Sequence, residues 1–437
     1  MKFDNILSEI NGFGKFQIKL VLIQILSRIT LPCHFLLNNF MAAVPSHHCD
    51  ISALDNGDLF GNLTLDQKLA VGIPAEQDGT LSSCQMFSVP QYQYLSGSNS
   101  SEDAFTVQCW NGWVYDNSTF KSTVATEWDL VCSRKGMNKA TATVFFIGVM
   151  VGAPLFGFLS DKFGRRPLLL VSYLSSTIFA VLSAFSPSYV MFWRNVFKLY
   201  SHLVFKKINI LLSRRLSFVL TFLTFSGIII SLDWTVGTWT LVGIAYCVNE
   251  WRMLILAVTS PLILAIIAWW LPESARWLTA NGNAEAAHYY IKKCAEMNNR
   301  TECMTDITTK VHFSIVFTLN YTVVDLFRTP KIRKLTVFSG IVWYGVAFTY
   351  FGISLNITGF GLNPYLTQFI FASIEMPMMI GVYLFLEKIG RKPGETGTLL
   401  LTGLCLFINM FVAQGNLRFC LNLLISFCRF FIFCQYV

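Results

Sequence analysis

Charged side chains are scarce in this chain. Asp, Glu, Lys and Arg make up 13% of its 437 residues, whereas 54% are hydrophobic and Phe alone occupies 39 positions. Soluble domains carry about 25% charged residues, so this composition excludes a set of ordinary soluble domains. The chain instead contains many apolar runs near the roughly 20 residues that cross a bilayer as a helix, which indicates a multi-pass membrane protein.

The motifs of several enzyme and ATPase classes are also lacking. The sequence contains no Walker loop, no His-Glu-x-x-His and no Gly-x-Ser-x-Gly, so it predicts no enzyme, no ATP site and no cofactor. His47 and His48 could bind a metal, but a lone pair is more often solvated surface, and no metal site is predicted. The net charge of +8 does not indicate nucleic acid, because the cations flank apolar runs.

Two long polar segments, 41–137 and 272–334, separate the apolar runs. In the first, acids far outnumber the four cations Lys68, Lys121, Arg134 and Lys135. The second contains Arg276, Lys292, Lys293, Arg300, Lys310, Arg328, Lys331, Arg333 and Lys334. The positive-inside rule places the second segment in the cytosol, and the first is best placed outside. The predicted organisation begins with a cytosolic N-terminus at 1–17, a first span at 18–40 and an extracellular loop domain at 41–137. The remainder of an N-terminal helical half follows at 138–271. A cytosolic loop domain at 272–334 and a partial C-terminal helical half at 335–437 complete the chain.

The acidic segment has further features of an extracellular domain. It holds four cysteines, Cys49, Cys84, Cys109 and Cys132, an even number that is compatible with two disulfides in an oxidising compartment. Four cysteines allow three connectivities, and the sequence leaves all three open. Glycosylation sequons begin at Asn62, Asn99 and Asn117.

A short charged motif occurs twice between apolar runs. Asp161-Lys-Phe-Gly164-Arg165-Arg166 aligns without a gap with Glu387-Lys-Ile-Gly390-Arg391-Lys392. Such an internal repeat indicates a transporter made of two similar six-helix halves. An acid at a helix end can accept hydrogen bonds from the first amides of a neighbouring helix, and a glycine permits a tight turn. Gly148, Gly152 and Gly157 on the preceding run predict close helix packing.

Several motifs resemble those of a known family. Gly157-x-Leu159-x-Asp161-x-x-Gly164-Arg165-Arg166 resembles the signature loop of the major facilitator superfamily, and "PESARWL" at 272–278 resembles its sugar-transporter-like signature. "ATEWDLVC" at 125–132 is typical of solute carrier family 22, the organic anion and cation transporters. "NGFGKFQ", "DGTLSSC" and "VDLFRTPKIRKL" look most like its organic anion transporter 2 type. The resemblance covers about 1–190 and 234–414.

This resemblance implies an all-α membrane protein with the major facilitator fold, two six-helix halves and a disulfide-bonded extracellular loop domain. The implied function is transport of small organic anions and related solutes by alternating access, as uniport or exchange, in the plasma membrane. Carboxylates, cyclic nucleotides and nucleobase-like compounds are the candidate solutes. The implied gating loops contain Asp161, Gly164, Arg165, Arg166, Glu387, Gly390 and Arg391, and the implied cytosolic signature contains Pro272, Glu273, Arg276 and Trp277. The expected partners are small organic solutes and the lipid bilayer, with a homo- or hetero-oligomer left open.

Two other functions remain open. One is a non-transporting, truncated membrane isoform, and the other is an organic cation or zwitterion transporter of the same family. The segment 192–216 is atypical for a span, because it is rich in Lys and Arg and lacks glycine, and we expect one complete crossing plus one irregular piece between 187 and 250. After residue 414 the family pattern fades, and the second half is expected to be incomplete.

A solute path between two helical halves should be lined by polar and aromatic side chains. The candidates are Asn38, Asn39, Trp234, Trp239, Tyr344, Phe348, Tyr350, Phe351 and Glu375. Aromatic faces bind flat organic solutes and cations, and an acid within an apolar run is a functional candidate by default. In the family that this chain resembles, many anion-carrying members have a lysine four positions after this acid, where this chain has Met379.

Overall fold

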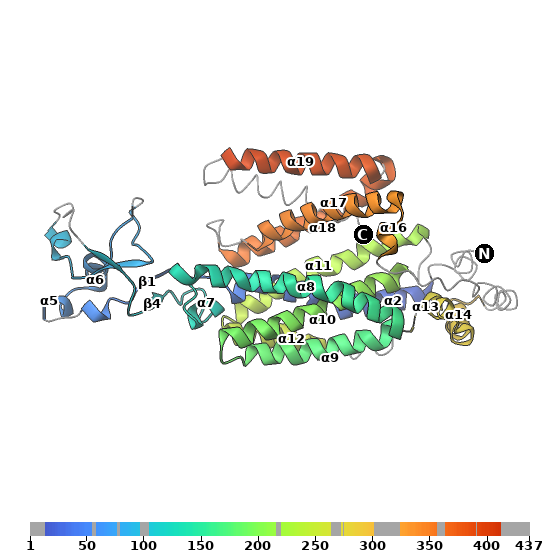
Figure 1. Cartoon of the computed structure of the whole chain (residues 1–437), viewed down its shortest axis with the longest axis horizontal. Coiled ribbons are helices and arrows are strands. Elements are labelled where there is room, and N and C mark those ends of the chain that lie inside the picture. Colours follow the sequence, from blue (N-terminus) through green and yellow to red (C-terminus); the bar gives the residue numbers. More distant parts are fainter. Residues whose placement is uncertain are drawn as a thin grey trace. The chain divides into compact units, whose positions relative to one another are not determined.

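A computed structural model of the chain describes residues 14–54, 58–76, 79–96, 105–215, 220–263, 272–273, 275–300, 324–355, 363–389 and 391–411 (Figure 1). Of residues 204–215, 220–231, 378–380 and 382–389, and of single positions in other helices, it describes the backbone only. The chain forms two compact units. The helical unit comprises Met1–Asn39, Val144–Cys247 and Ile255–Val437, and the loop domain comprises Phe40–Thr143 and Val248–Leu254.

Long helices build the helical unit. Its first helices, α2 (Lys15–Arg28), α3 (Thr30–Leu36) and α4 (Asn38–Met41), follow one another with helical backbone angles at the linking residues Ile29 and Leu37. The longer helices are α8 (Lys135–Phe163), α9 (Arg165–Ala184), α10 (Tyr189–Arg215), α11 (Leu220–Cys247), α17 (Pro330–Ser354), α18 (Pro364–Ile389) and α19 (Arg391–Phe411). The shorter ones are α12 (Trp251–Thr259), α13 (Ala275–Ala280), α14 (Ala284–Met297) and α16 (Asp325–Arg328). In Figure 1 the long helices run in roughly one direction, with α9 packed on α10 and α18 on α11.

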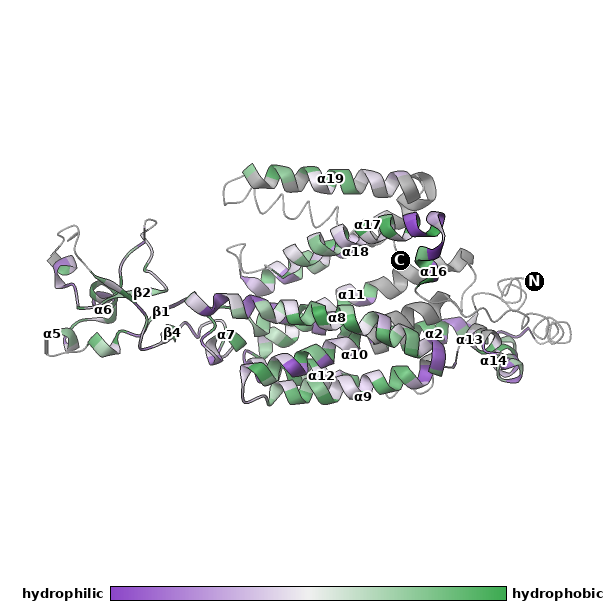
Figure 2. Cartoon of the chain, in the orientation of Figure 1, coloured by the Kyte–Doolittle hydropathy of each residue, from purple (hydrophilic) through white to green (hydrophobic). Residues whose placement is uncertain are grey.

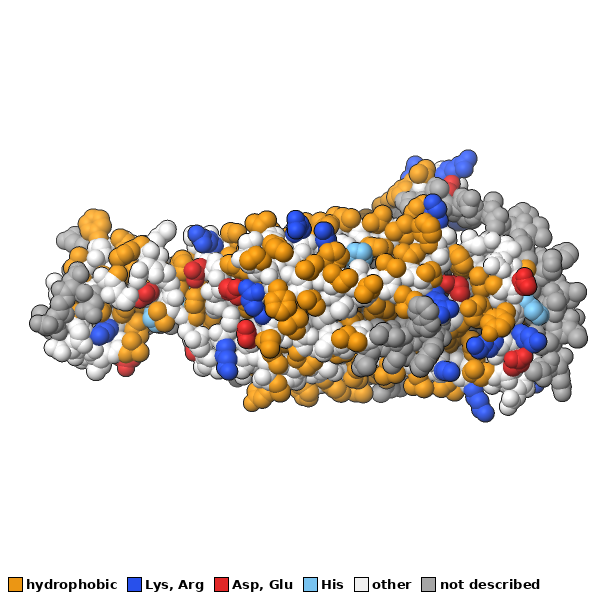
Figure 3. Space-filling view, turned by 90° about the horizontal axis from the view of Figure 1, so that it is seen from below, with side chains coloured by type: hydrophobic (Ala, Val, Ile, Leu, Met, Phe, Trp, Pro, Cys, Tyr) orange, Lys and Arg blue, Asp and Glu red, His pale blue; other side chains and the backbone are white. Residues whose placement is uncertain are grey.

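Apolar side chains dominate these helices. Within the described residues, Cys132–Phe163, Arg166–Ala184 and Pro330–Gly352 form helices that are long and apolar enough to cross a membrane. Figure 2 shows hydrophobic residues along α8, α9 and α17, and hydrophobic side chains cover most of the helical unit on the face drawn in Figure 3. Apolar residues on the exposed face of a helix are expected where that face meets lipid.

The region between 187 and 250 differs from the expectation. It forms α10, of 27 residues, and α11, of 28 residues. At 1.5 Å per residue each helix is about 40 Å long, which exceeds the roughly 30 Å of the hydrocarbon core. The described backbone of both pieces is regular helix, which corrects the expected irregular piece, and the expectation of one complete crossing stays a prediction.

The helical period separates apolar from charged side chains in the first part of α10. Phe192, Val196 and Leu203 are buried and recur at helical spacing on one face. Arg194 and Lys198 are exposed on other faces. A count of cations along the segment misses this division, because an amphipathic helix separates the two kinds of side chain by face.

The close packing of α8 on α10 depends on two glycines. A Cβ atom at Gly148 would lie 2.7 Å from the carbonyl oxygen of Phe197, and one at Gly152 would lie 2.3 Å from that of Ser201. The predicted close approach is confirmed at these two positions. At Gly157 a Cβ would meet no atom within 4 Å, so the prediction is wrong there.

The loop domain has short elements around a small core. Strand β1 (His47–Cys49) pairs antiparallel with β4 (Trp113–Tyr115), and β2 (Gln85–Phe87) pairs antiparallel with β3 (Thr106–Gln108). Its helices are α5 (Asp58–Gly61), α6 (Leu65–Gly72) and α7 (Val124–Glu127). Ile51, Leu54, Phe60, Ile73 and Met86 pack around two cysteines in the core. The hydrophobic pattern did not predict these strands, which are only three residues long.

Candidate solute path and signature contacts

The turn between α8 and α9 carries the first copy of the charged repeat. Gly164 follows the end of α8 with a φ of 92°. Residues with a Cβ rarely adopt this angle, so the turn requires a glycine. A Cβ there would also lie 3.1 Å from a carboxylate oxygen of Glu273 and 3.2 Å from the ring of Trp277. The turn therefore lies directly against the "PESARWL" motif.

Two hydrogen bonds join this turn to the "PESARWL" motif. The backbone N–H of Arg166 donates to Oε2 of Glu273 at 3.1 Å, and Nε1–H of Trp277 donates to the carbonyl oxygen of Asp161 at 2.9 Å. Arg166 is the second residue of α9, so the Glu273 carboxylate lies at the positive end of the helix dipole. The sequence suggested Asp161 for this kind of role, and at the start of α9 the structure shows Glu273 in it. Pro272, which precedes it, is half-buried.

The remaining signature residues are described only in part. For Arg165, Arg276, Glu387 and Arg391 the structure gives the backbone but no side chain, and Gly390 lies outside the described residues. The predicted gating contacts of these residues stay predictions.

A buried amide cluster joins the start of α2 to α14, and it was not predicted. Oδ1 of Asn298 accepts the backbone N–H of Phe16 at 3.0 Å, and Nδ2 of Asn298 donates to Oε1 of Gln17 at 3.0 Å. Nε2 of Gln17 donates to Sγ of Cys294 at 3.4 Å. Burial raises the pKa of the Cys294 thiol to about 11, although its hydrogen bond with Gln17 acts in the opposite direction. The cluster ties the "GFGKFQ" motif to a helix far along the sequence.

Aromatic side chains from helices before and after the polar segment 272–334 meet between α3, α11 and α17. Nε1–H of Trp234 donates to the hydroxyl of Tyr350 at 2.9 Å. Phe35 lies 6.0 Å from the Trp234 ring and stacks on Phe351 at 6.3 Å, and Phe146 approaches Phe351 at 4.8 Å. The predicted path residues Trp234, Tyr350 and Phe351 are thus together. Phe35 and Phe146 were missed, because a Phe in an apolar run carries no signal of its own.

Polar contacts join the same helices nearby. Nδ2 of Asn39 donates to Oε1 of Gln368 at 3.0 Å and to the carbonyl oxygen of Ser354 at 2.7 Å. Nε1–H of Trp239 donates to Oγ of Ser373 at 3.1 Å. We call this end of the helical unit the Asn39 end. The other end, where α8 finishes, is the Asp161 end.

Four other candidates lie in different surroundings. Glu375 is buried on α18, at 7% exposure, and Asn38 is half-buried. Tyr344 and Phe348 are 71% and 69% exposed and stack on each other at 6.0 Å. The structure does not bring these last two into the aromatic cluster, and Tyr344 lies about 10 Å along α17 from Phe351.

A buried ion pair lies between α2 and α11, and the sequence analysis missed it. Nε of Arg28 is 3.0 Å from Oδ2 of Asp233, and the side chains are 11% and 1% exposed. Arg28 ends α2, about 20 Å along the helix axis from Lys15 and a similar distance from Met41. Asp233 lies near the middle of α11. The available signal was one opposite charge in each of two apolar runs, which marks functional sites in membrane helices.

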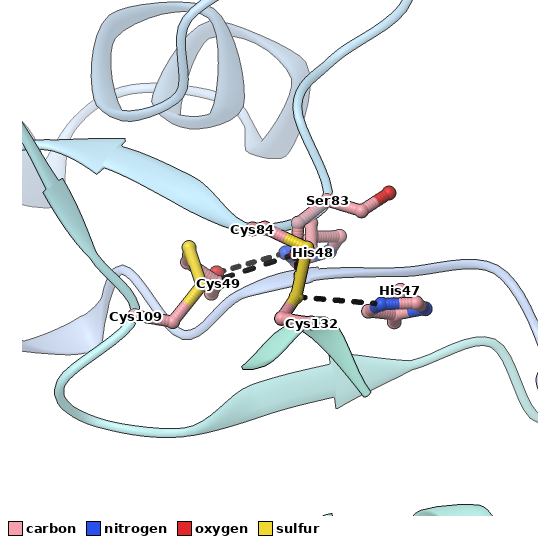
Figure 4. Close-up of a disulfide and its surroundings, with 7 residues drawn as sticks. All are labelled: His47, His48, Cys49, Ser83, Cys84, Cys109 and Cys132. Carbon is pink, nitrogen blue, oxygen red and sulfur yellow. Dashed lines mark hydrogen bonds between the residues drawn. A yellow bond between two sulfur atoms is a disulfide. The ribbon is translucent and has the colours of Figure 1, made fainter. Parts of the chain in front are cut away.

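The cysteines of the loop domain form two disulfides, Cys49–Cys109 and Cys84–Cys132 (Figure 4). This is one of the three connectivities that the sequence left open. Nε2 of His47 lies 4.0 Å from Sγ of Cys132. Donor atoms of His47, Cys84 and Cys132 are within 4.8 Å of one another, but both sulfurs are in a disulfide, and metals bind the thiolate.

The "ATEWDLVC" motif holds the loop domain together at α7. Nε1–H of Trp251 donates to Oε2 of Glu127 at 2.7 Å, and Arg252 forms an ion pair with the same carboxylate. The hydroxyl of Tyr115 donates to Oδ1 of Asp129 at 2.9 Å. Burial, and then the Asp129 carboxylate, raise the pKa of Tyr115 above its ordinary value. The acids of this motif therefore act as hydrogen-bond acceptors within the domain. Asn62 and Asn117 are exposed, and Asn99 lies outside the described residues.

Comparison with known proteins identifies the family. A family model described as Major Facilitator Superfamily matches residues 134–436. Solute carrier family 22 member 7 of Bos taurus is 40% identical over 432 residues, which cover 94% of this chain and 77% of that protein. The chain belongs to solute carrier family 22 of the major facilitator superfamily. The Homo sapiens protein of the same name is 40% identical over 429 residues, 95% of this chain and 78% of that one. Solute carrier family 22 member 6 of Mus musculus is 32% identical over 425 residues, 95% of this chain and 76% of that one.

The fold of this family 22 protein resembles that of a solved transporter. The partially occluded inward open conformation of the xylose transporter XylE from E. coli aligns with a TM-score of 0.56 and 14% identity, covering 96% of this chain and 85% of that one. The predicted major facilitator fold is thereby confirmed. The family and the fold are those of transporters, so the chain is a membrane transporter and not an enzyme.

Proposed function

We propose that this family 22 transporter carries small organic anions and related organic solutes by alternating access, as a uniporter or an exchanger. The observation that carries the proposal is the hydrogen bond from Trp234 to Tyr350 within a cluster of phenylalanines. Flat aromatic faces suit planar organic solutes. The cluster joins helices from before and after the polar segment 272–334, as a site between two moving halves requires.

The two ends of the helical unit supply contacts that could alternate. At the Asn39 end, Asn39 bonds to Gln368 and Trp239 to Ser373, and both bonds join α4 or α11 to α18. In the proposed cycle these bonds break when the site opens at that end. The Asp161 turn and its counterpart near Glu387 close the other end in the same cycle.

We also propose the orientation. The N-terminus and 272–334 lie in the cytosol, the loop domain lies outside, and the chain resides in the plasma membrane. Disulfides between Cys49 and Cys109 and between Cys84 and Cys132 support this orientation, because they persist in oxidising compartments. The nine cations of 272–334 support it through the positive-inside rule.

Uptake measurements test the proposal. Cells that express the full chain receive a labelled aromatic carboxylate, a cyclic nucleotide or a nucleobase, and surface levels are measured by biotinylation. We expect saturable uptake that Tyr350→Phe reduces and Tyr344→Phe does not, because only Tyr350 lies in the cluster. Uptake equal to that of untransfected cells, at a verified surface level, contradicts the proposal.

The buried acid Glu375 favours organic cations as a second candidate. It is 7% exposed on α18, and a buried carboxylate is a natural counter-ion for a cation. For this alternative, we expect uptake of a quaternary ammonium compound that is lost in Glu375→Gln. Cation uptake that is unchanged in Glu375→Gln removes the basis of this alternative.

A further inference from the structure

The ion pair between Arg28 and Asp233 is not explained by stability. Its two side chains are 11% and 1% exposed, and a buried pair of this kind is often no more stabilising than well-packed apolar residues of the same size. Taking both charges out of water is costly, so a pair at the centre of a transporter has reason to be a site. Its position relative to the aromatic cluster shows which kind of site.

Arg28 lies on the face of the first helices that meets α17 and α18. Phe35 and Asn39 follow it by 7 and 11 residues, which at 3.6 residues per turn places each of them within about 20° of Arg28 around the helix axis. Phe35 stacks on Phe351, and Asn39 bonds to Gln368. Arg28 is thus on the same face, about 10 Å along the axis from Phe35 and away from the Asn39 end.

Asp233 lies beside the cluster on the opposing helix. Its neighbour in the sequence, Trp234, contacts both Phe35 and Tyr350. Sγ–H of Cys33 donates to the carbonyl oxygen of Gly237 at 3.1 Å, which shows how closely α3 and α11 pack one turn further on. A solute ring against Trp234 would therefore have the Arg28 guanidinium within reach of a carboxylate attached to that ring.

We propose that Arg28 binds the carboxylate of a flat aromatic monoanion, and that Asp233 occupies the guanidinium when no solute is bound. A guanidinium presents a planar fork of N–H donors that matches a carboxylate, and Asp233 shows a carboxylate already in that position. Asp233 then competes with the solute for Arg28. Between transport events the Asp233 carboxylate compensates the charge of the Arg28 guanidinium. This inference rests on the proposed function and names the solute class of its site.

Binding to the purified full chain tests this without requiring transport. The probes are benzoate, and benzamide as its uncharged counterpart, and the measurement is the concentration dependence of the shift in unfolding temperature. Arg28→Gln alone would leave Asp233 without its cation and risk the fold, so the variants are Asp233→Asn and the double variant Arg28→Gln/Asp233→Asn. Arg194→Gln, which removes an exposed cation from α10, is the matched control.

We expect Asp233→Asn to bind benzoate more tightly than the unmodified chain, by about tenfold, because the competing carboxylate is gone. The double variant should lose about tenfold or more of that benzoate affinity, with benzamide binding kept. Arg194→Gln should bind both as the unmodified chain does. Equal benzoate affinity in all four proteins, or none in any, overturns the proposal. If benzoate binds as expected but no cell takes it up, the proposed transport fails and the site stands.

Discussion

The two ends of the helical unit are held by different kinds of contact. At the Asn39 end, Asn39 and Trp239 reach across to α18 through single side-chain hydrogen bonds. At the Asp161 end, a glycine-dependent turn meets the Glu273 carboxylate and the Trp277 ring, all between α8 and α13. The first set joins segments from opposite sides of 272–334, and the second joins the turn between α8 and α9 to the start of 272–334.

This difference suggests that the two ends have different roles in the transport cycle. Neutral side-chain hydrogen bonds contribute about 1 kcal/mol each and can be exchanged for water, so they suit a contact that must open. A turn with a positive φ, held by a carboxylate at a helix N-terminus, fixes one local geometry. Such a contact suits helices that move together as a rigid body. In the proposed cycle the Asp161 end keeps α8, α9 and α13 together as one body.

Gly164→Ala should cause the largest effect, because it strains the turn at the Asp161 end. The left-handed φ costs a residue with a Cβ about 1–2 kcal/mol, and the added atom would press on Glu273 and Trp277. We expect a lower unfolding temperature in detergent and less protein at the cell surface. Gly157→Ala is the control, since its Cβ meets nothing within 4 Å. Equal stability of the two variants would show that the turn is not constrained as described.

Trp234→Phe should weaken the contact between α11 and α17 by about 1 kcal/mol, because the Tyr350 hydroxyl loses its donor. Tyr350→Phe should have a similar effect, and the double variant should add little to either single one. The unfolding temperatures of the four proteins form a double-mutant cycle. Strict additivity would mean that this hydrogen bond does not join the helices.

Glu273→Gln should be milder, because glutamine keeps the acceptor and removes only the charge. The interaction of a carboxylate with a helix N-terminus contributes about 0.3–1 kcal/mol. We expect a small loss of stability that shrinks as salt concentration rises. Glu76→Gln, at an exposed position of the loop domain outside any helix, is the control for a general charge effect. A salt-independent loss would point to a role other than charge.

The smallest expected effect is on the chemical reactivity of the Cys294 thiol. Its pKa of about 11 keeps it protonated at neutral pH, and the thiolate is the reactive form. Alkylation, followed by mass spectrometry of its peptide, should be slow at neutral pH and speed up as pH rises toward 11, while the exposed Cys247 reacts readily. Because the folded state holds this proton more tightly than the unfolded chain, the stability of the fold should fall as the pH rises from the ordinary thiol pKa toward 11. Asn298→Ala should expose Cys294, and unchanged protection in that variant would contradict the cluster.

Motifs and hydropathy predicted the fold and the family because both signals are local. The turn at Gly164 and the "PESARWL" motif are each readable within ten residues, and the four cysteines lie in one polar segment. Their pairing was not readable, because three connectivities fit the same spacing. Only the folded loop domain selects Cys49–Cys109 and Cys84–Cys132.

The contacts that the sequence analysis missed are mainly those between helices far apart in the sequence. Arg28 and Asp233 lie in separate apolar runs, and nothing in either run identifies the other as its partner. The aromatic candidates show the same limit, since Tyr350 and Tyr344 look alike in the sequence, whereas in the structure they are 6% and 71% exposed.

The most direct test of alternating access is to prevent the Asn39 end from opening. Asn39→Cys and Gln368→Cys together place two thiols where the two side chains now share a hydrogen bond, and a short bifunctional thiol reagent can link them. Each single variant treated with the same reagent is the control. We expect the linked protein to lose uptake and to recover it when the link is reduced. Full uptake by the linked protein would contradict the account, because transport would then not require α4 and α18 to separate.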